Sequence, residues 1–150
     1  MKVIEYEKKY KKDFIELNKN WIQKYFTIEE HDLEQLDNVE HYLSEGAMIF
    51  FAVEDEQILS TCMALQLESN VWEICKFATN EKYKGRGAGK AVFQAAMDYA
   101  IKNKAKKIVI YSNQILKPAL HIYQSFGFKE VPVDNDDYAR CDYQAEMMIN

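Results

Sequence analysis

The chain has 150 residues, 48% apolar and 29% charged, which is typical of one globular domain and short for two. Its net charge of −5 gives no sign of a nucleic-acid or anionic-membrane partner. Without an apolar run of about 18 residues or an apolar N-terminal stretch, we expect a soluble, cytoplasmic protein with no membrane partner. The three cysteines form no Cys-x-x-Cys pair and the three histidines show no ligand spacing, so we expect no disulfide framework and no metal.

Charge is distributed unevenly along the chain. Residues 25–75 hold 12 acidic side chains and no Lys or Arg, whereas residues 76–130 hold 11 basic and three acidic ones. A polyanionic cofactor on the second half and a cationic substrate on the first would suit this asymmetry. The alternative is that both runs are solvated faces without a partner.

Hydrophobic periodicity predicts the elements in chain order. A strand at 3–6 precedes a helix that ends at Tyr25, and a second helix over 33–43 has Asp32 as its N-cap and Gly46 as its stop. Strands at 47–53, 57–67 and 71–78, joined by short turns, form an antiparallel meander. A helix at 88–103, a strand at 107–111, a helix at 118–126 and strands at 128–131 and 141–149 complete the chain. This order predicts an α+β fold with one mixed sheet, in which the meander is followed by a β-α-β crossover and helices flank the sheet.

Three of the five glycines, Gly85, Gly87 and Gly89, lie between the last meander strand and the long helix. Glycines let backbone N–H groups approach oxygen atoms closely, and a helix N-terminus favours a phosphate, so this loop predicts an anion cradle. A Walker A loop would need Gly at 84 and Ser or Thr at 91, and a dinucleotide fingerprint would need Gly at 90. The chain has other residues at these positions, which leaves a different phosphate ligand or a turn without a ligand.

The segment 84–89 reads Lys-x-x-Gly-x-Gly and resembles the cofactor loop of the GNAT superfamily of acyl-CoA-dependent N-acetyltransferases, whose pattern is Arg/Gln-x-x-Gly-x-Gly/Ala. Lys84 departs from that pattern, because lysine has the positive charge of arginine but lacks the planar guanidinium with its parallel donors. A second motif of the family is present as Asn113, Ala119, Tyr123 and Gly127-Phe128, with a longer spacing between its first two members than the commonest form. The resemblance covers roughly residues 47–131 and implies a single GNAT-like domain over 1–150 that uses acetyl-CoA as co-substrate.

The resemblance also implies how acetyl-CoA is held. The pyrophosphate would lie on the N–H groups of the glycine loop, and the pantetheine arm would pair like a strand with the last meander strand. The residues expected to bind the cofactor are Phe77, Thr79, Lys84, Gly85, Arg86, Gly87, Ala88, Gly89, Lys90, Asn113 and Ala119.

Two residues are expected to carry the catalysis that the resemblance implies. Tyr123 resembles the general acid of the family, because a phenol with a pKa near 10 is protonated at neutral pH and can donate to sulfur. The alternative is a core aromatic side chain. Glu73 lies where several family members have a carboxylate that takes the proton of the amine. Strand alternation puts Glu73 on the face of Phe77 and opposite Lys76, and the alternative role of Glu73 is a surface or cross-strand pair with Lys76.

Trp21 and Tyr25 are expected to bind the acetyl acceptor by forming one wall of an amine pocket. The alternative is that they belong to the hydrophobic core. Arg140 reaches the substrate in some related chains, and its alternative partners are the aspartates of 134–137. We therefore expect acetyl transfer from acetyl-CoA to the primary amine of a small or amino-acid-like molecule, by direct attack of the amine on the thioester. The alternatives are an acyl-CoA sensor without turnover and an enzyme acting on a protein amine. Homodimers are common in the family, which leaves a homodimer open here.

Overall fold

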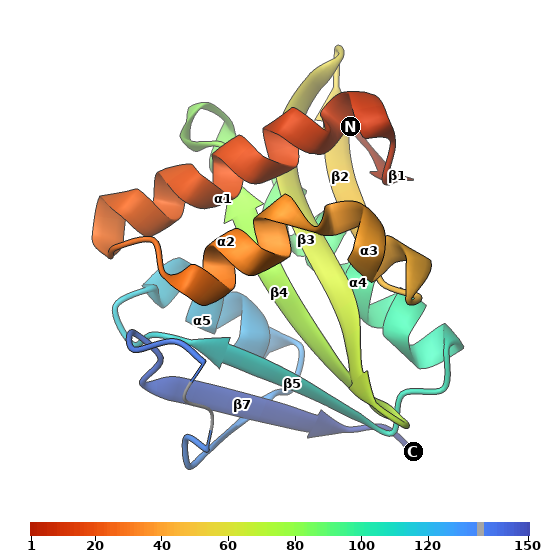
Figure 1. The fold of residues 1–150 in the computed structure, drawn as a ribbon, viewed down its shortest axis with the longest axis vertical. Helices are drawn as coiled ribbons and strands as arrows, with labels where there is room; N and C mark the ends of the chain where they lie inside the picture. Colours follow the sequence, from red (N-terminus) through yellow and green to blue (C-terminus); the bar gives the residue numbers. More distant parts are fainter. Residues whose placement is uncertain (135–136) are drawn as a thin grey trace.

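The computed structural model describes residues 1–134 and 137–150. Within these residues, seven strands form one sheet in the order β1-β2-β3-β4-β5-β7-β6 (Figure 1). Neighbouring strands are antiparallel except for the parallel pair β4 and β5, so the predicted α+β class with a mixed sheet is confirmed. The strands are β1 (Lys2–Glu5), β2 (Met48–Glu54), β3 (Gln57–Glu68), β4 (Val71–Thr79), β5 (Lys107–Ser112), β6 (Lys129–Val131) and β7 (Tyr143–Met148).

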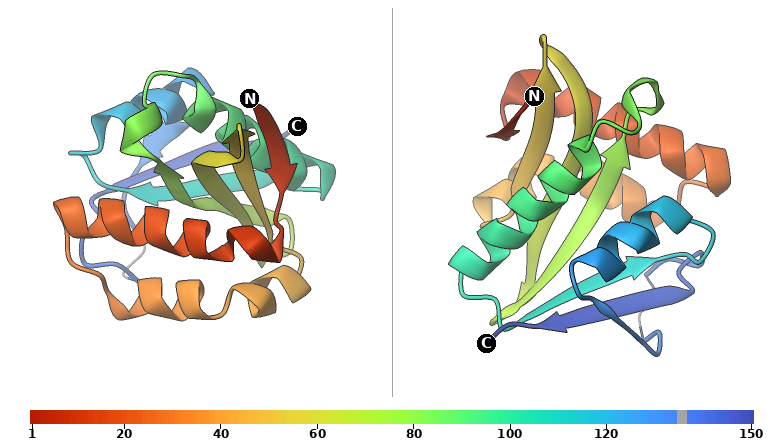
Figure 2. Two further views of the ribbon diagram at one scale, coloured as in Figure 1. Left: turned by 90° about the horizontal axis from the view of Figure 1, so that it is seen from above. Right: turned by 180° about the vertical axis from the view of Figure 1, so that it is seen from behind.

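Helices cover both faces of the sheet (Figure 2). One face carries α4 (Ala88–Lys102) and α5 (Lys117–Ser125), and the other carries α1 (Lys11–Tyr25), α2 (Glu30–Asp37) and α3 (Val39–Ser44). Each helix buries at least one apolar side chain, and α4 buries a continuous apolar stripe, which is the arrangement that helical periodicity favours. No helix in the described part of the chain is both long and apolar enough to cross a membrane.

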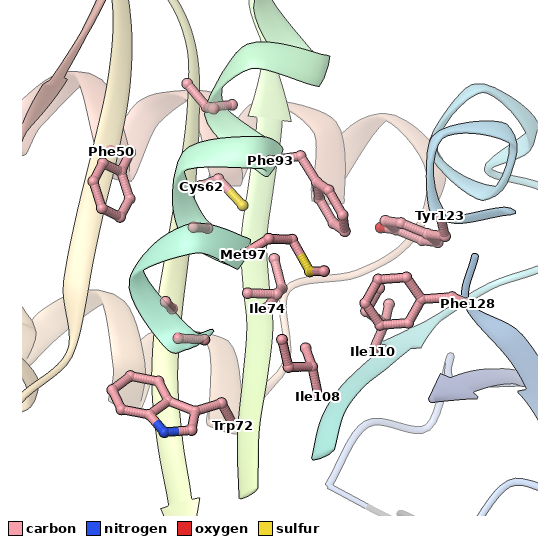
Figure 3. Close-up of a cluster of buried hydrophobic side chains, with 14 of the residues drawn as sticks. Phe50, Cys62, Trp72, Ile74, Phe93, Met97, Ile108, Ile110, Tyr123 and Phe128 are labelled. Atoms are coloured by element: carbon pink, nitrogen blue, oxygen red, sulfur yellow. The ribbon is translucent and has the colours of Figure 1, made fainter. Parts of the chain in front are cut away.

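Each face of the sheet has its own hydrophobic core. Beneath α4 and α5, the ring of Phe93 lies 5.5 Å from that of Tyr123 and 5.9 Å from that of Phe128 (Figure 3). On the other face, Phe14 of α1 and Phe51 of β2 are almost fully buried in a second cluster. Fully burying such side chains contributes roughly 1.5–3 kcal/mol each, so both helical layers are firmly attached to the sheet.

The sheet divides between its two parallel strands. β4 pairs with β5 only from Val71 to Glu73, although β4 continues to Thr79. Figure 1 shows the two strands starting together near the C-terminus and then separating. Beyond Glu73 the backbone edge of β4 therefore faces a gap in the sheet rather than a neighbouring strand.

A bulge in β4 corrects the predicted alternation of its side chains. Lys76 has φ +50°, and the register with β3 shifts between Thr61 and Met63. A bulge adds one residue to a strand, so the side chains beyond it exchange faces. Phe77 consequently packs on the α4 and α5 face, against the rings of Phe93 and Tyr123, and does not share the face of Glu73.

The helix predicted over 33–43 is two helices, α2 and α3, which meet at Asn38. Asp32 is not the N-cap of α2. The N-cap is Glu29, and Asp32 is the third helical residue, whose Oδ2 accepts a hydrogen bond of 2.9 Å from the Glu29 backbone N–H. This reciprocal capping box fixes the start of α2 and helps to orient the carboxylate of Asp32.

Candidate active site

A cleft of about 220 Å³ lies where β4 and β5 separate. Residues 73–79 of β4 form one wall, residues 111–112 of β5, Asn113 and the start of α5 form another, and the end of α1 also lines the cleft. Because the cleft passes through a split in the sheet, side chains from both faces reach it. Most of the predicted site residues line this cleft, namely Trp21, Tyr25, Glu73, Phe77, Thr79, Lys84, Asn113, Ala119, Tyr123 and Arg140.

The glycine loop leads into the first turn of α4. Gly85 and Gly87 have φ values of +81° and +79°, a left-handed conformation that glycine adopts without strain. The first hydrogen bond of α4 joins the Ala91 N–H to the Gly87 carbonyl at 3.1 Å. The N–H groups of residues 88–90 therefore have no partner inside the helix, and the helix dipole favours an anion beside them.

Gly89 is needed for a different reason, which is close packing. A Cβ atom at this position would lie 3.1 Å from Thr79 Oγ1 and 3.3 Å from Phe77 Cζ. The absence of a side chain lets the N-terminus of α4 approach the end of β4. The predicted anion cradle and the predicted strand for pantetheine are therefore adjacent.

The two cationic side chains of the loop are exposed and lie beside acidic residues. Lys84 Nζ is 3.6 Å from a carboxylate oxygen of Glu81, and Arg86 donates a hydrogen bond of 3.1 Å to Glu54. Exposed pairs of this kind contribute little to stability, so either cation can be redirected toward a phosphate at small cost.

Glu73 is the last residue of β4 that pairs with β5, and its side chain is only 7% exposed while lining the cleft. Burial raises its pKa to about 7, and the nearby charge of Lys76 opposes that rise. The alternative of a surface pair with Lys76 is wrong, because Glu73 is buried and Lys76 forms its ion pair with Asp32. A carboxylate with a pKa near 7 can both take up and release a proton at neutral pH.

Tyr123 projects from α5 into the same region. Its ring lies beside that of Phe93 (Figure 3) and also contacts that of Phe77. Burial is the main cause that raises its pKa above the ordinary value of 10. The phenol is therefore protonated at neutral pH. Tyr123 is both part of the core and part of the cleft lining, so its two predicted roles are compatible.

The second predicted motif is held by local hydrogen bonds. Asn113 Nδ2 donates to the Arg140 carbonyl at 2.6 Å, and Asn113 Oδ1 accepts from the Ile115 N–H at 2.9 Å. This side chain joins the β5–α5 loop to the segment before β7. Ala119 is half-buried on the cleft wall.

On the acceptor side, Trp21 and Tyr25 lie at the end of α1, where both line the cleft. Tyr25 is 43% exposed, and Trp21 is half-buried with its Nε1–H donating to Asn18 at 3.1 Å, so neither is a core residue. Among the described residues, no cluster of His, Cys, Asp or Glu side chains is suited to hold a metal ion.

A buried charge network beside the cleft was not predicted. The fully buried Asp32 accepts two hydrogen bonds from Arg140, at 2.7 and 2.6 Å, and a third from Lys76 at 3.1 Å. Burial disfavours the ionised carboxyl, but the two cations overcome this effect and lower the pKa of Asp32 to about 2. Glu29 accepts from Arg140 at 3.3 Å, and Tyr138 accepts from Lys76 at 3.0 Å.

This network changes the expected role of Arg140. Its ion pairs in the described part of the chain are with Asp32 and Glu29 of the α2 N-terminus, and residue 136, one of the predicted aspartate partners, lies outside the described residues. The sequence contained one signal for the network, the basic side chain of Lys76 in the middle of a largely apolar strand. Its partner, Asp32, lies 44 residues earlier, which no periodicity could reveal.

Comparisons with known proteins agree with this geometry. The model of the acetyltransferase (GNAT) family matches residues 15–128. N-acetylaspartate synthetase from Xenopus tropicalis is 28% identical over 104 residues, which is 68% of this chain and 36% of that protein. The chain spans less than half the length of the curated relatives that it matches.

Two solved structures share the whole fold. An acetyltransferase of the GNAT family from Staphylococcus aureus superposes with a TM-score of 0.89 at 20% identity, covering 99% of both chains. The PaiA N-acetyltransferase from Thermoplasma acidophilum, in complex with coenzyme A, has a TM-score of 0.76 at 16% identity and covers 99% of this chain and 100% of its own. At these identities the likeness establishes the fold alone.

Proposed function

The chain belongs to the acetyltransferase (GNAT) family, and we propose that it transfers the acetyl group of acetyl-CoA to the primary amine of a small molecule. The observation that carries the proposal is the cleft where β4 and β5 separate, with the glycine loop at one end and Glu73 and Tyr123 on its walls. Trp21, Tyr25 and Arg140 also line the cleft, whose volume of about 220 Å³ suits an acceptor of limited size.

The residues of the cleft fit acetyl-CoA. The N–H groups at 88–90 have no partner inside α4, which suits a pyrophosphate, and Gly89 leaves the approach to β4 open. Beyond Glu73, β4 pairs with no strand of the described residues on the side of β5, so its backbone can pair with an extended amide-containing arm. Lys84 and Arg86 would add charge near the phosphates.

Bound acetyl-CoA would supply the thioester carbon that the amine attacks. Glu73 would take the proton that the amine loses, because its pKa of about 7 keeps a large fraction ionised at neutral pH. Tyr123 would hold a proton at its hydroxyl for the departing sulfur, and its raised pKa keeps that proton in place beforehand. The bulge lets one strand present Glu73 and Phe77 from opposite faces to one cleft.

The first test is release of free thiol from acetyl-CoA in the presence of a panel of primary amines. Tyr123→Phe removes only the hydroxyl, so we expect turnover to fall about 100-fold or more with little change in the affinity for acetyl-CoA. Tyr99→Phe is the matched control, because that hydroxyl bonds to the Gly46 carbonyl outside the cleft. Equal turnover of the two variants would remove Tyr123 from the mechanism, and tight binding without turnover would favour the sensor alternative.

A further inference from the structure

The guanidinium of Arg140 is held from almost every direction. Its centre lies 4.4 Å from the ring of Tyr138 and 5.6 Å from the ring of Trp21, so aromatic rings lie against it. Its two Nη atoms form a fork around Asp32, and the second hydrogen of Nη1 points to Glu29. Only 12% of the side chain is exposed, yet Arg140 lines the cleft.

Two N–H donors on one edge of this guanidinium have no acceptor among the described residues. Arginine has five N–H donors, and the contacts with Asp32 and Glu29 use three of them. The Nε–H and the second hydrogen of Nη2 lie parallel on the same edge and have no acceptor among the described residues. A pair of parallel donors matches the two oxygen atoms of a carboxylate.

The neighbouring cation also has a donor without an acceptor among the described residues. Lys76 Nζ has three donors, two of which bond to Asp32 and Tyr138, and its side chain is 3% exposed while the residue lines the cleft. Lys76 and Arg140 bond to the same oxygen, Asp32 Oδ1, so they form a pair of adjacent cations. The distance of 3.3 Å from Arg140 Nη1 to Glu29 Oε2 is longer than usual for a charge-assisted hydrogen bond, so Glu29 holds Arg140 only weakly.

We propose that Arg140, with Lys76 beside it, binds a carboxylate of the acceptor, so that the acceptor is an amine bearing a carboxylate, such as an amino acid. The inference rests on the proposed acetyl transfer and narrows its substrate class. The rings and Asp32 keep the guanidinium rigid, so the free edge is already oriented before a ligand arrives. An ordered donor pair is most selective for a planar anion, and it gives no such contact to a neutral amide oxygen.

The test compares the standard L-amino acids with their α-carboxamides as acceptors, using thiol release from acetyl-CoA. The wild type should use at least one amino acid with a kcat/KM at least ten times that of its carboxamide. Arg140→Lys keeps the charge and removes the parallel donors, so it should lower kcat/KM for that amino acid about 10- to 100-fold more than for the carboxamide. Most of the loss should lie in KM. Glu29→Gln, which loosens the same segment without touching the free edge, should lower the use of both acceptors equally.

The outcomes separate this proposal from the proposed function. Equal use of the two acceptors by the wild type, or turnover only of amines without a carboxylate, would overturn the carboxylate site and leave acetyl transfer standing. If no acceptor is turned over, melts of the protein–CoA complex decide: a rise in Tm with an amino acid and not with its carboxamide supports the site, and no selective rise overturns it. No response to acetyl-CoA itself would contradict the proposed function.

Discussion

Glu73→Gln should make the protein more stable and less active. The carboxyl has a pKa of about 7 in the folded protein, compared with an ordinary value of 4.5, because it is buried. A raised pKa favours the protonated form in the fold, so the contribution of Glu73 to stability is present below pH 4.5 and is lost as the pH rises through 7. Gln has nearly the same shape without the charge and therefore avoids that loss.

The size of the effect follows from the pKa difference. Integrating between the two pKa values gives a penalty of about 3 kcal/mol for ionised Glu73 at pH 8 and about 1 kcal/mol at pH 5. For a chain of this length, 1 kcal/mol corresponds to roughly 2–4 °C in Tm. Glu73→Gln should therefore raise Tm by about 6–12 °C at pH 8 and by about 2–4 °C at pH 5.

The assay is thermal unfolding of the wild type and the variant at both pH values without ligand. Glu68→Gln is the control, because Glu68 is exposed at the end of β3 and its substitution should leave Tm nearly unchanged. In parallel, kcat/KM of the wild type should fall below pH 7 as Glu73 is protonated, and the variant should lose about 100-fold in turnover without that dependence. An equal Tm shift at pH 5 and pH 8 would refute the desolvated carboxylate on which the reasoning rests.

Three other substitutions test separate parts of the site. Gly89→Ala should weaken acetyl-CoA binding and lower Tm, because the added Cβ would lie 3.1 Å from Thr79 Oγ1. At a helix position without such a contact, replacing Gly by Ala would raise stability by up to about 1 kcal/mol. A higher Tm with unchanged affinity would therefore contradict the close contact. Lys84→Ala should weaken acetyl-CoA binding several-fold at low salt and less at high salt, with Tm unchanged, and an affinity independent of Lys84 at every salt concentration would remove it from the phosphate site. Asp32→Asn should cost about 3–5 kcal/mol in urea unfolding at pH 7, because it leaves two buried cations without their carboxylate. That difference should shrink between pH 4 and pH 2, since the stability supplied by a lowered pKa is lost as the pH falls through about 2; a difference that stays constant would argue against an ionised Asp32.

Local patterns predicted the elements well where each depends on its own residues. The glycine loop was recognisable because Gly85 and Gly87 adopt the positive φ values that glycine allows. The apolar stripe of α4 follows directly from helical periodicity. The division of the second helix at Asn38 was missed, since no proline or glycine marks it.

Features that depend on pairing between distant segments could not be predicted. The bulge at Lys76 exists only in the register of β4 with β3, and it reverses the face assigned to Phe77. The network around Asp32 joins the start of α2, the middle of β4 and the segment before β7. Strand alternation and charge counts hold no information on such contacts, so the ion pairs of Arg140 with Asp32 and Glu29 were not predicted.

The central claim is that the glycine loop and the split sheet bind acetyl-CoA. The most direct test is a thermal-melt titration of the wild type and Gly87→Val with acetyl-CoA, with ATP and NAD as controls. Binding to the folded state should stabilise the wild type by about 2.7 kcal/mol at 100 times the Kd, a rise of several degrees that ATP and NAD do not match and that Gly87→Val largely loses. No rise with millimolar acetyl-CoA, or the same rise with ATP and NAD, would contradict the account.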